Sequence, residues 1–412
     1  MKAVFVNRFF HPDESATSRM LSDLAFRLAR SQVRVVVVTS RQLYENPVAR
    51  LPAHEVIEGV EVWRIATSTL GRHSLPGRAV DYVTFYLSAA LRLLRVLQPG
   101  DVVIAKTDPP MLSVIAGRVA RWRGASLINW LQDVFPEVVR ALMPGAMPRW
   151  LHSALVGVRD RSLRQADMNV VIGDSMGTRV TRLGVDAAHI RIIPNWVDCE
   201  ALRPMATQLS QTRARLGLQD RFVVGYSGNF GRAHDFRTLI AAARLLIEAP
   251  QIAFLITGGG ARNAELRRAV AREALPNFHF QDYQPAAQLS DSMAAADVHL
   301  VSLLPAIEGL IVPSKAYGIL AAGRPLVFVG DTDGEIARMI RRHDCGAAVA
   351  IADAAGLAGL LLQLQADPAR CAALGANSRH LALARYTSER AAADWLEILR
   401  RIGASSPMSS RQ

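Results

Sequence analysis

The sequence predicts an α/β protein with two domains, each built around a doubly wound parallel sheet. Three observations support this prediction. The chain has 412 residues, enough for two or three domains of ordinary size. Segments with strand patterning alternate with segments of helical spacing along the whole chain. Several predicted strands are uninterrupted apolar runs, which a sheet needs when helices cover both of its faces.

The first half of the chain contains the elements of one Rossmann-like domain, expected to span 1–195. A β-branched and aromatic run at 3–7 predicts a strand, and apolar residues at helical spacing over 17–30 predict the helix that follows. A nearly continuous valine run at 33–39 predicts a strand buried on both faces. Further strands are predicted at 60–65, 101–105, 126–130 and 169–172, and a strand that ends in Pro-Asn near residue 190 marks the expected exit from this domain.

The alternation restarts after residue 195 and predicts a second Rossmann-like domain over 196–386. A final helix is predicted at 387–403 and is expected to pack back on the first domain, and the polar, Ser-rich end at 404–412 is predicted to be disordered. The predicted strands of the second domain are 222–226, 253–257, 278–281, 298–302, 326–329 and 347–350, and its helices include 235–247 and 333–342.

Composition narrows the classes of function. The chain carries 48 Lys plus Arg against 36 Asp plus Glu, a net charge of +12, but no basic run and only 6% aromatic residues, which disfavours nucleic-acid binding. A solvated basic surface and attraction to anionic lipid or to a phosphorylated substrate both remain open. Cys199, Cys345 and Cys371 are isolated, so we expect no disulfide framework or zinc site and a cytoplasmic location. No apolar stretch reaches the length of a membrane span, so a soluble or peripheral protein is expected.

The most informative segment runs from Glu308 to Pro325. Pro313 and Ser314 stand at a predicted helix start, where backbone N–H groups are free to bind an anion, and Lys315 is one of only three lysines in the chain. This combination predicts a diphosphate site, with Glu308 placed to accept hydrogen bonds from hydroxyls. A capped helix without a ligand is the alternative. Ligands of open parallel sheets bind at the carboxyl ends of the strands, so the cleft between two such domains is the expected active site.

The string EGLIVPSKAYGILAAGRP at 308–325 resembles a motif of the retaining nucleotide-sugar glycosyltransferases of family four, which have the GT-B fold. It is similar in particular to bacterial transferases that build exopolysaccharide and O-antigen, such as the colanic-acid and fucosamine transferases. The resemblance extends over roughly residues 2–400. The other matching segments are HPDESATSRMLSDLAFRLA from 11, NWLQDVFPE at 129–137, IIPNWVD at 192–198, GYSGNFGRAHDFRTLIAAARLL from 225, ITGGGA at 256–261 and AAADVHLVSL at 294–303.

The resemblance implies a donor site in the second domain and an acceptor site in the first. Glu308 matches the glutamate region that holds the donor sugar's hydroxyls, with the N–H groups of Gly309 and Leu310 nearby. The second family glutamate, which contacts the ribose, aligns with Gly318 and is absent.

The Arg and Lys that clamp the donor phosphates in the family align with Asn229 and His234. Arg232 and Lys315 are therefore expected to neutralise the diphosphate. Arg232 as a plain surface charge and His234 as a helix-start residue are the alternatives. The remaining donor-site candidates are Gly228 and the Gly258 and Gly259 turn, although any strand-to-helix turn can use glycines.

In the first domain, Ser15, Thr17 and Ser18 replace the family's glycine-rich loop, and their hydroxyls either contact the phosphates or cap a helix. Gln132 aligns with a frequent active-site histidine and is expected to position a hydroxyl. Asp133 is expected either to accept the acceptor's proton or to act as a structural cap.

The resemblance and these features predict a retaining glycosyltransferase that moves a sugar from a nucleotide sugar to a hydroxyl of a saccharide acceptor, expected to be lipid-linked and used in surface polysaccharide synthesis. We expect it to act in the cytoplasm or on the cytoplasmic face of the inner membrane, in contact with anionic lipid. No cofactor is expected. Metal independence is expected because no Asp-x-Asp carboxylate pair is identified that could hold Mg²⁺, and the leaving phosphate is expected to take the acceptor's proton. Two alternatives stay open: a nucleotide-sugar 2-epimerase on the same fold, and a non-catalytic partner subunit that binds nucleotide sugar.

A predicted helix over 78–97 bears on partners. Its apolar residues Val80, Val83, Leu87, Leu91 and Leu94 share one face, and it carries Arg78, Arg92 and Arg95. Such a helix either lies in a membrane interface, where it would deliver the enzyme to a lipid-linked acceptor, or packs in the core of the first domain.

Overall fold

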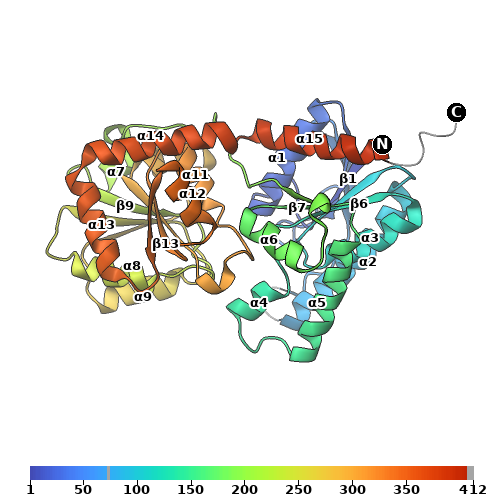
Figure 1. Cartoon of the computed structure of the whole chain (residues 1–412), viewed down its shortest axis with the longest axis horizontal. Coiled ribbons are helices and arrows are strands. Elements are labelled where there is room, and N and C mark those ends of the chain that lie inside the picture. The colour runs from blue at the N-terminus through green and yellow to red at the C-terminus, as the bar shows by residue number, and fades with distance from the viewer. Residues whose placement is uncertain (72–74, 406–412) are drawn as a thin grey trace. The chain divides into compact units, whose positions relative to one another are not determined.

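The computed structural model describes residues 1–71 and 75–405 (Figure 1). The chain forms two compact units, one made of Met1–Pro194 with the segment from Ser388 onward, the other of Asn195–Thr387. Each unit has its own sheet with helices on both faces, as the sequence predicts. Helix α15 (Ser388–Ser405) belongs to the first unit. Residues 404 and 405 of the predicted tail complete this helix, and the rest of that tail lies outside the described residues.

The first unit is built on an eight-stranded sheet in the order β3-β4-β2-β1-β5-β6-β7-β8. All neighbouring strands are parallel except β3, which pairs antiparallel with β4. The predicted strand that ends in Pro-Asn is β8, the other edge strand of this sheet. The sequence analysis missed only β3 in this sheet, because it is a partly exposed edge strand without an apolar run. The strands are β1 (Lys2–Val6), β2 (Arg34–Ser40), β3 (His54–Ile57), β4 (Val60–Ile65), β5 (Val102–Lys106), β6 (Ser126–Trp130), β7 (Met168–Val171) and β8 (Ile190–Ile192).

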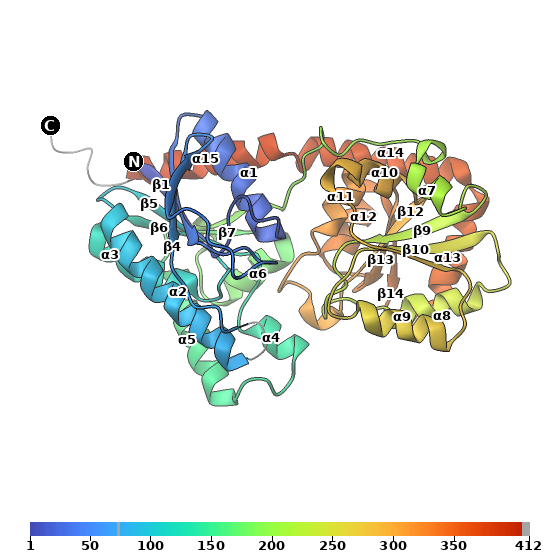
Figure 2. The same ribbon diagram turned by 180° about the vertical axis from the view of Figure 1, so that it is seen from behind.

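Helices cover both faces of this sheet (Figure 2). On one face, valines of β1, β2 and β5 pack against Phe85, Ala89 and Leu93 of α2 and against Ala116 of α3. On the other face, Phe5 lies 6.3 Å from the ring of Trp395 in α15. The helices are α1 (Ala16–Arg30), α2 (Leu75–Val96), α3 (Leu112–Arg123), α4 (Glu137–Leu142), α5 (Arg149–Arg164) and α6 (Asp174–Arg182).

The second unit has a six-stranded, fully parallel sheet in the order β11-β10-β9-β12-β13-β14. Its strands lie within a residue or two of the predicted ranges. They are β9 (Phe222–Ser227), β10 (Ile252–Thr257), β11 (Phe278–Gln281), β12 (Val298–Ser302), β13 (Leu326–Gly330) and β14 (Gly346–Ala350). The helices are α7 (Gln211–Arg215), α8 (Arg237–Leu245), α9 (Asn263–Arg272), α10 (Leu289–Ala294), α11 (Lys315–Ala321), α12 (Glu335–His343), α13 (Ala354–Ala366) and α14 (Pro368–Arg385).

The strand orders indicate where a ligand of each unit is expected to bind. The order reverses between β1 and β5 in the first sheet and between β9 and β12 in the second. Loops after these strands leave in opposite directions, which opens a crevice at the carboxyl edge. Among the helices within residues 1–71 and 75–405, none has the length and apolar character needed to cross a bilayer.

Helix α15 contributes a large buried side chain to the first unit, which allows a stability test. Trp395 is fully buried and lies 5.0 Å from the ring of Trp130. Trp395→Ala should lower the free energy of unfolding by about 3–5 kcal/mol because it leaves a cavity. Urea unfolding followed by circular dichroism measures the change. Trp122→Ala, at a position that is 77% exposed, is the matched control and should change stability by less than about 0.5 kcal/mol. Equal effects would show that α15 does not stabilise this unit.

Candidate functional site

Most of the predicted donor-site residues lie at the carboxyl edge of the second sheet. The loop after β9 contains Gly228 to His234, and the loop after β10 contains Gly258 to Gly260. The segment after β12 leads into α11, whose first residue is Lys315. Parallel strands end at the same edge, so loops separated by up to 86 residues come together here, as the contact between Lys315 and Asn229 shows.

Lys315 is the centre of this group. Its Nζ donates to the hydroxyl of Tyr226, to the backbone carbonyl of Asn229 at 2.5 Å and to Nε2 of His234 at 3.1 Å. Nζ also lies 4.4 Å from the centre of the Tyr226 ring. Gly228 permits this approach, because its φ is +112° and a Cβ there would stand 3.0 Å from Cε of Lys315. The amine is thus held by neutral groups.

Burial determines the charge states of Lys315 and His234. Desolvation lowers the pKa of Lys315 to about 7. Nδ1 of His234 lies 2.5 Å from the carbonyl oxygen of Ser302, which can only accept, so Nδ1 carries the proton and Nε2 accepts from Lys315. Burial and the Lys315 charge lower the pKa of His234 to about 3, so its ring is neutral at physiological pH. An anion beside Lys315 would restore the amine's charge.

Glu308 has a structural partner. Its Oε1 accepts a hydrogen bond of 2.8 Å from the backbone N–H of Glu335 at the start of α12. The N–H of Leu310 donates to Ile307 O at 2.9 Å. Arg232 lies exposed in the loop after β9, and Pro313 and Ser314 receive the first backbone hydrogen bonds of α11.

The glycine turn after β10 packs against the loop after β9. The N–H of Phe230 donates to Gly259 O at 2.6 Å, and a Cβ on Gly260 would stand 2.0 Å from Oδ1 of Asn229. This close approach between loops is sufficient reason for glycine here. The ring of Tyr283, 59% exposed, lies over Gly258 and Gly259. The sequence analysis did not select Tyr283, although an aromatic residue directly after a strand was the available signal.

The sequence does contain one Asp-x-Asp pair, Asp331-Thr332-Asp333, directly after β13. The sequence analysis overlooked it, so the expectation that no such pair is present was wrong. Oδ1 of Asp331 accepts from the N–H of Asp333 at 2.9 Å, and the Asp333 carboxylate pairs with Arg341 at 3.5 Å. The two carboxylates are therefore engaged with their own loop and with α12. No cluster of three or more metal-ligating side chains occurs within the described part of the chain.

In the first unit, the residues at 15–18 hold their own loop together. The Asp13 carboxylate accepts from the N–H of Ser15 at 2.9 Å and from the Ser15 hydroxyl. Ser18 is fully buried and donates to the carbonyl of Asp13 at 2.8 Å. The carbonyl of Thr17 accepts from Nζ of Lys106 at 2.8 Å. The hydroxyls of Ser15 and Ser18 thus already have partners in this loop.

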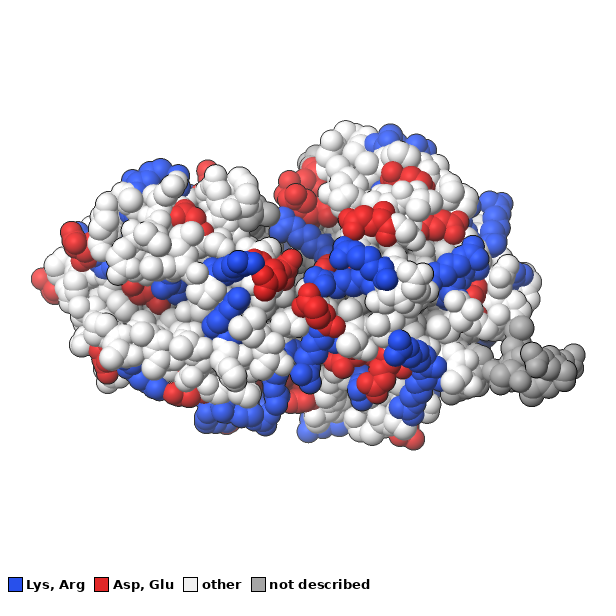
Figure 3. Space-filling model, turned by 90° about the horizontal axis from the view of Figure 1, so that it is seen from above, with Lys and Arg blue, Asp and Glu red and all other residues white. Residues whose placement is uncertain are grey.

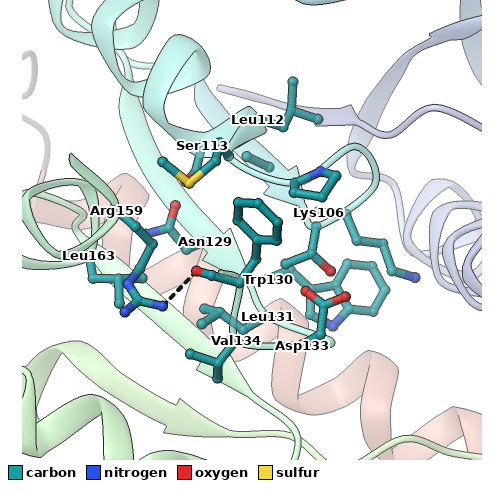
Figure 4. A pocket seen from close by; sticks show the side chains of 15 residues that line it. Lys106, Leu112, Ser113, Asn129, Trp130, Leu131, Asp133, Val134, Arg159 and Leu163 are labelled. Atoms are coloured by element: carbon teal, nitrogen blue, oxygen red, sulfur yellow. Dashed lines mark hydrogen bonds between the residues drawn. The ribbon is translucent and has the colours of Figure 1, made fainter. Parts of the chain in front are cut away.

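A small cavity of about 30 Å³ opens between the loops after β5 and β6, with room for one or two water molecules (Figure 4). Figure 4 shows Asp133, Trp130 and Lys106 grouped together, while Arg159 donates to the Phe135 carbonyl at 2.8 Å. Nζ of the buried Lys106 lies 4.0 Å from the centre of the Trp130 ring. Burial lowers the pKa of Lys106 to about 7.

The carboxyl group of Asp133 lines this cavity, and the charge of Asp108 influences its ionisation. Burial and the charge of Asp108 raise the pKa of Asp133 to about 7, although a hydrogen bond with Thr107 opposes the shift. Burial raises the pKa of Asp108 to about 6, against the charges of Arg8 and Lys106. Oδ1 of Asp133 and Nε2 of Gln132 are buried without a hydrogen-bond partner in the described residues. Such atoms mark a place where a polar ligand fits. The sequence analysis selected Asp133 and Gln132 but missed Asp108, which directly follows β5.

Two family models match the chain. Residues 15–196 match the model described as "Glycosyl transferase 4-like domain", and residues 221–367 match the model described as "Glycosyl transferases group 1". The first match lies in the first unit except for its last two residues, and the second match lies in the second unit.

Two curated relatives are also named as glycosyltransferases. The chain is 26% identical over 294 residues to the probable glycosyltransferase WbjE of Pseudomonas aeruginosa, covering 69% of this chain and 71% of the relative. It is 27% identical over 225 residues to the putative colanic acid biosynthesis glycosyl transferase WcaI of Escherichia coli, covering 54% of this chain and 55% of that one.

Solved structures confirm the predicted GT-B fold. The sucrose-phosphate synthase of Thermosynechococcus elongatus matches with a TM-score of 0.78 at 19% identity, covering 98% of this chain and 100% of that chain. The Anabaena protein Alr3699/HepE in complex with UDP-glucose matches with a TM-score of 0.71 at 16% identity, covering 97% and 100%.

The raised pKa of Asp133 predicts a pH-dependent loss of stability. Between its unfolded value of 3.8 and its folded value of about 7, the folded state keeps a proton that the unfolded state releases. The free energy of unfolding therefore decreases as pH rises through this window. Asp133→Asn removes the effect, so its stability relative to the parent should rise by on the order of 1–2 kcal/mol between pH about 4 and pH about 8. Urea unfolding at both pH values measures this. Trp122→Ala, which removes no titratable group from the same unit, should give a constant difference. A constant difference for Asp133→Asn would contradict the assignment.

Proposed function

This chain belongs to the GT-B glycosyltransferases of family four, and on that premise we propose that it transfers a sugar from a nucleoside diphosphate donor to a saccharide hydroxyl with retention of configuration. The observation that carries the donor assignment is the Lys315 amine at the carboxyl edge of the second sheet. Its three hydrogen-bond acceptors are a phenol, a carbonyl and a neutral imidazole. A donor diphosphate would provide the negative charge that this amine lacks.

The proposed donor site uses the loops around Lys315. Arg232 is the second cation, exposed on the same loop as Asn229 and His234, and it would reach the diphosphate from solvent. Gly258 and Gly259 would lie beside the nucleoside, with the Tyr283 ring offering a flat face for the base. The likeness in fold to a protein solved with UDP-glucose supports a uridine nucleotide as the first donor to test.

The proposed chemistry needs no protein nucleophile. The bond between the anomeric carbon and the leaving phosphate oxygen breaks, and its electron pair stays with the diphosphate. The acceptor oxygen bonds to the anomeric carbon on the same face, and its proton passes to the departing phosphate oxygen. Lys315 and Arg232 stabilise the charge that develops on the diphosphate, which should supply much of the rate enhancement. We propose this reaction without a metal, since the carboxylates of Asp331 and Asp333 have partners elsewhere.

The proposed acceptor site is the cavity of the first unit. Asp133 lines this cavity, and its Oδ1 is buried without a partner in the described structure, so an acceptor hydroxyl can donate to it. The neighbouring Gln132 also has a buried side-chain N–H group without a partner in the described residues. Asp108 lies close enough to influence the ionisation of Asp133. We propose that the acceptor is a lipid-linked saccharide of surface polysaccharide synthesis, used at the cytoplasmic side of an anionic membrane. The similarity to a colanic acid transferase supports this acceptor class.

The test of this function is transfer by the purified full chain. Thermal shift against a panel of UDP, GDP and dTDP sugars identifies the donor, because a bound donor raises the melting temperature by mass action. Incubation of that donor with synthetic lipid-linked saccharides should release nucleoside diphosphate only when an acceptor is present. Proton NMR should show a product with the donor's anomeric configuration, and EDTA should leave the rate unchanged. Epimerised sugar formed from donor alone would instead establish the 2-epimerase, and inversion would refute the retaining mechanism.

The low pKa of Lys315 predicts how donor affinity depends on pH. A bound diphosphate favours the charged amine, so its pKa rises from about 7 on binding. Affinity for the nucleoside diphosphate should be constant below pH about 7 and should fall by up to tenfold per pH unit above it. Calorimetric titration measures this between pH about 6 and 9. In Lys315→Ala this slope should disappear and transfer should fall by at least 100-fold, on the order of 3 kcal/mol of transition-state stabilisation. Unchanged transfer in a folded Lys315→Ala protein would refute the phosphate assignment.

A further inference from the structure

Helix α2 has two apolar faces, and only one of them is buried. Phe85, Ala89 and Leu93 pack against the sheet and are fully buried. Leu87 and Leu91 are 61% and 58% exposed. An α-helix turns about 100° per residue, so residues 87 and 91 point away from the sheet that residues 85 and 89 face. The exposed set is a continuous stripe at spacings of three or four residues: Val80, Val83, Leu87 and Leu91.

Hydrogen bonds on the buried side of α2 prevent the helix from rotating this exposed stripe toward the core. Asp81 on the buried side accepts hydrogen bonds from the N–H groups of Leu70 at 2.9 Å and Gly71 at 2.8 Å, and from the Ser68 hydroxyl at 2.6 Å. Tyr86 donates its hydroxyl to the Pro110 carbonyl. These contacts and the core residues fix the rotation of α2. The two sequence interpretations of this helix, core element and interfacial element, therefore describe its two sides.

Helices α3 and α5 continue the exposed apolar surface in the same layer. Leu127 and Ala116 hold α3 against the sheet in the same core cluster as α2. On the outer sides, Trp122 of α3 is 77% exposed and Trp150 of α5 is 73% exposed. Large exposed aromatics are uncommon on soluble proteins, whereas tryptophan is enriched where proteins meet the head-group region of a bilayer.

The exposed charged side chains of these three helices are all positively charged. Their only acidic residues, Asp81 and Asp160, are turned inward and lie 3.7 Å from Arg8 and 2.6 Å from Arg159 respectively. The exposed charges are arginines: Arg78, Arg95, Arg118, Arg121, Arg149, Arg161 and Arg164. Figure 3 shows a different distribution on the surfaces that it presents, where basic and acidic side chains are intermixed in each unit. A face that contacts only water ordinarily carries both acidic and basic side chains.

We propose that the outer surface of α2, α3 and α5 docks on a bilayer that contains anionic phospholipid. This membrane-docking face is defined by its apolar residues Val80, Val83, Leu87, Leu91, Trp122 and Trp150 and by its seven exposed arginines. The apolar side chains enter the interfacial region and the arginines contact the phosphates. A second copy of the chain is a poorer occupant, because a twofold pairing of this face would bring arginines against arginines. The proposal rests on the proposed function only for its purpose, namely access to a lipid-linked acceptor.

Vesicle binding by the full chain tests the docking face directly. Co-sedimentation should show at least tenfold more bound protein on vesicles of phosphatidylcholine with about one third phosphatidylglycerol than on phosphatidylcholine alone. Binding should fall at least fivefold at about 0.5 M salt, because salt screens the arginines.

Paired variants separate this face from the rest of the surface. Leu87→Gln with Leu91→Gln should reduce vesicle binding at least fivefold. Leu245→Gln with Leu383→Gln, at helix positions of the second unit that are 58% and 49% exposed, is the matched control and should bind like the parent. Arg95→Gln with Arg118→Gln should also reduce binding, whereas Arg237→Gln with Arg268→Gln should not.

Three outcomes would overturn the proposal: equal binding to neutral and anionic vesicles, equal loss in the control pairs, or a dimer in light scattering that Leu87→Gln with Leu91→Gln dissociates. Transfer to a water-soluble acceptor saccharide, measured without vesicles, should be within twofold of the parent in all four variant pairs. Docking without any transfer would therefore refute the proposed function alone, and transfer without docking would refute only the membrane-docking face.

Discussion

Burial of the parallel strands on both faces is the constraint on which the rest of the structure depends. Helices cover each sheet on two sides, so strand residues such as Val36 and Val103 are apolar and buried in the core. Polar and ionisable groups are left to the loops at the carboxyl edges. Lys106, Asp108 and Asp133 gather there in the first unit, and Lys315 and His234 gather there in the second.

The three lysines of an arginine-rich chain occupy special positions. Lys2 is buried and forms an ion pair of 3.0 Å with Asp101. Lys106 and Lys315 instead contact carbonyls, aromatic rings or imidazole, and burial lowers the pKa of each to about 7. A lysine responds to burial in this way, whereas arginine stays charged. Each unit therefore has one amine whose charge can be changed by a bound ligand.

Helix α2 shows why periodicity alone left its role open. Apolar residues at helical spacing predict that one face is buried, and the segment 78–97 contains two such faces. The face selected from the sequence, with Val80, Leu87 and Leu91, is the exposed one, while Phe85, Ala89 and Leu93 form the core contact. The choice depends on where Asp81 and Tyr86 find their hydrogen-bond partners, and those lie 10–24 residues away in the chain.

The sequence by itself determined the two parallel-sheet units, nearly all strand positions, the family and the segments that supply the site, because strands, helices and motifs are local patterns. Only the tertiary structure decided which side chains meet. The Glu308 carboxylate accepts a hydrogen bond at the start of α12, and the Ser18 hydroxyl donates within its own loop. Asp108 and Tyr283 lie near the carboxyl edges of the sheets, although the sequence analysis did not select them. The edge strand β3, which the sequence did not predict, also depends on pairing with its neighbour β4. These outcomes are set by pairings between distant residues, and a pattern read along one chain does not contain them.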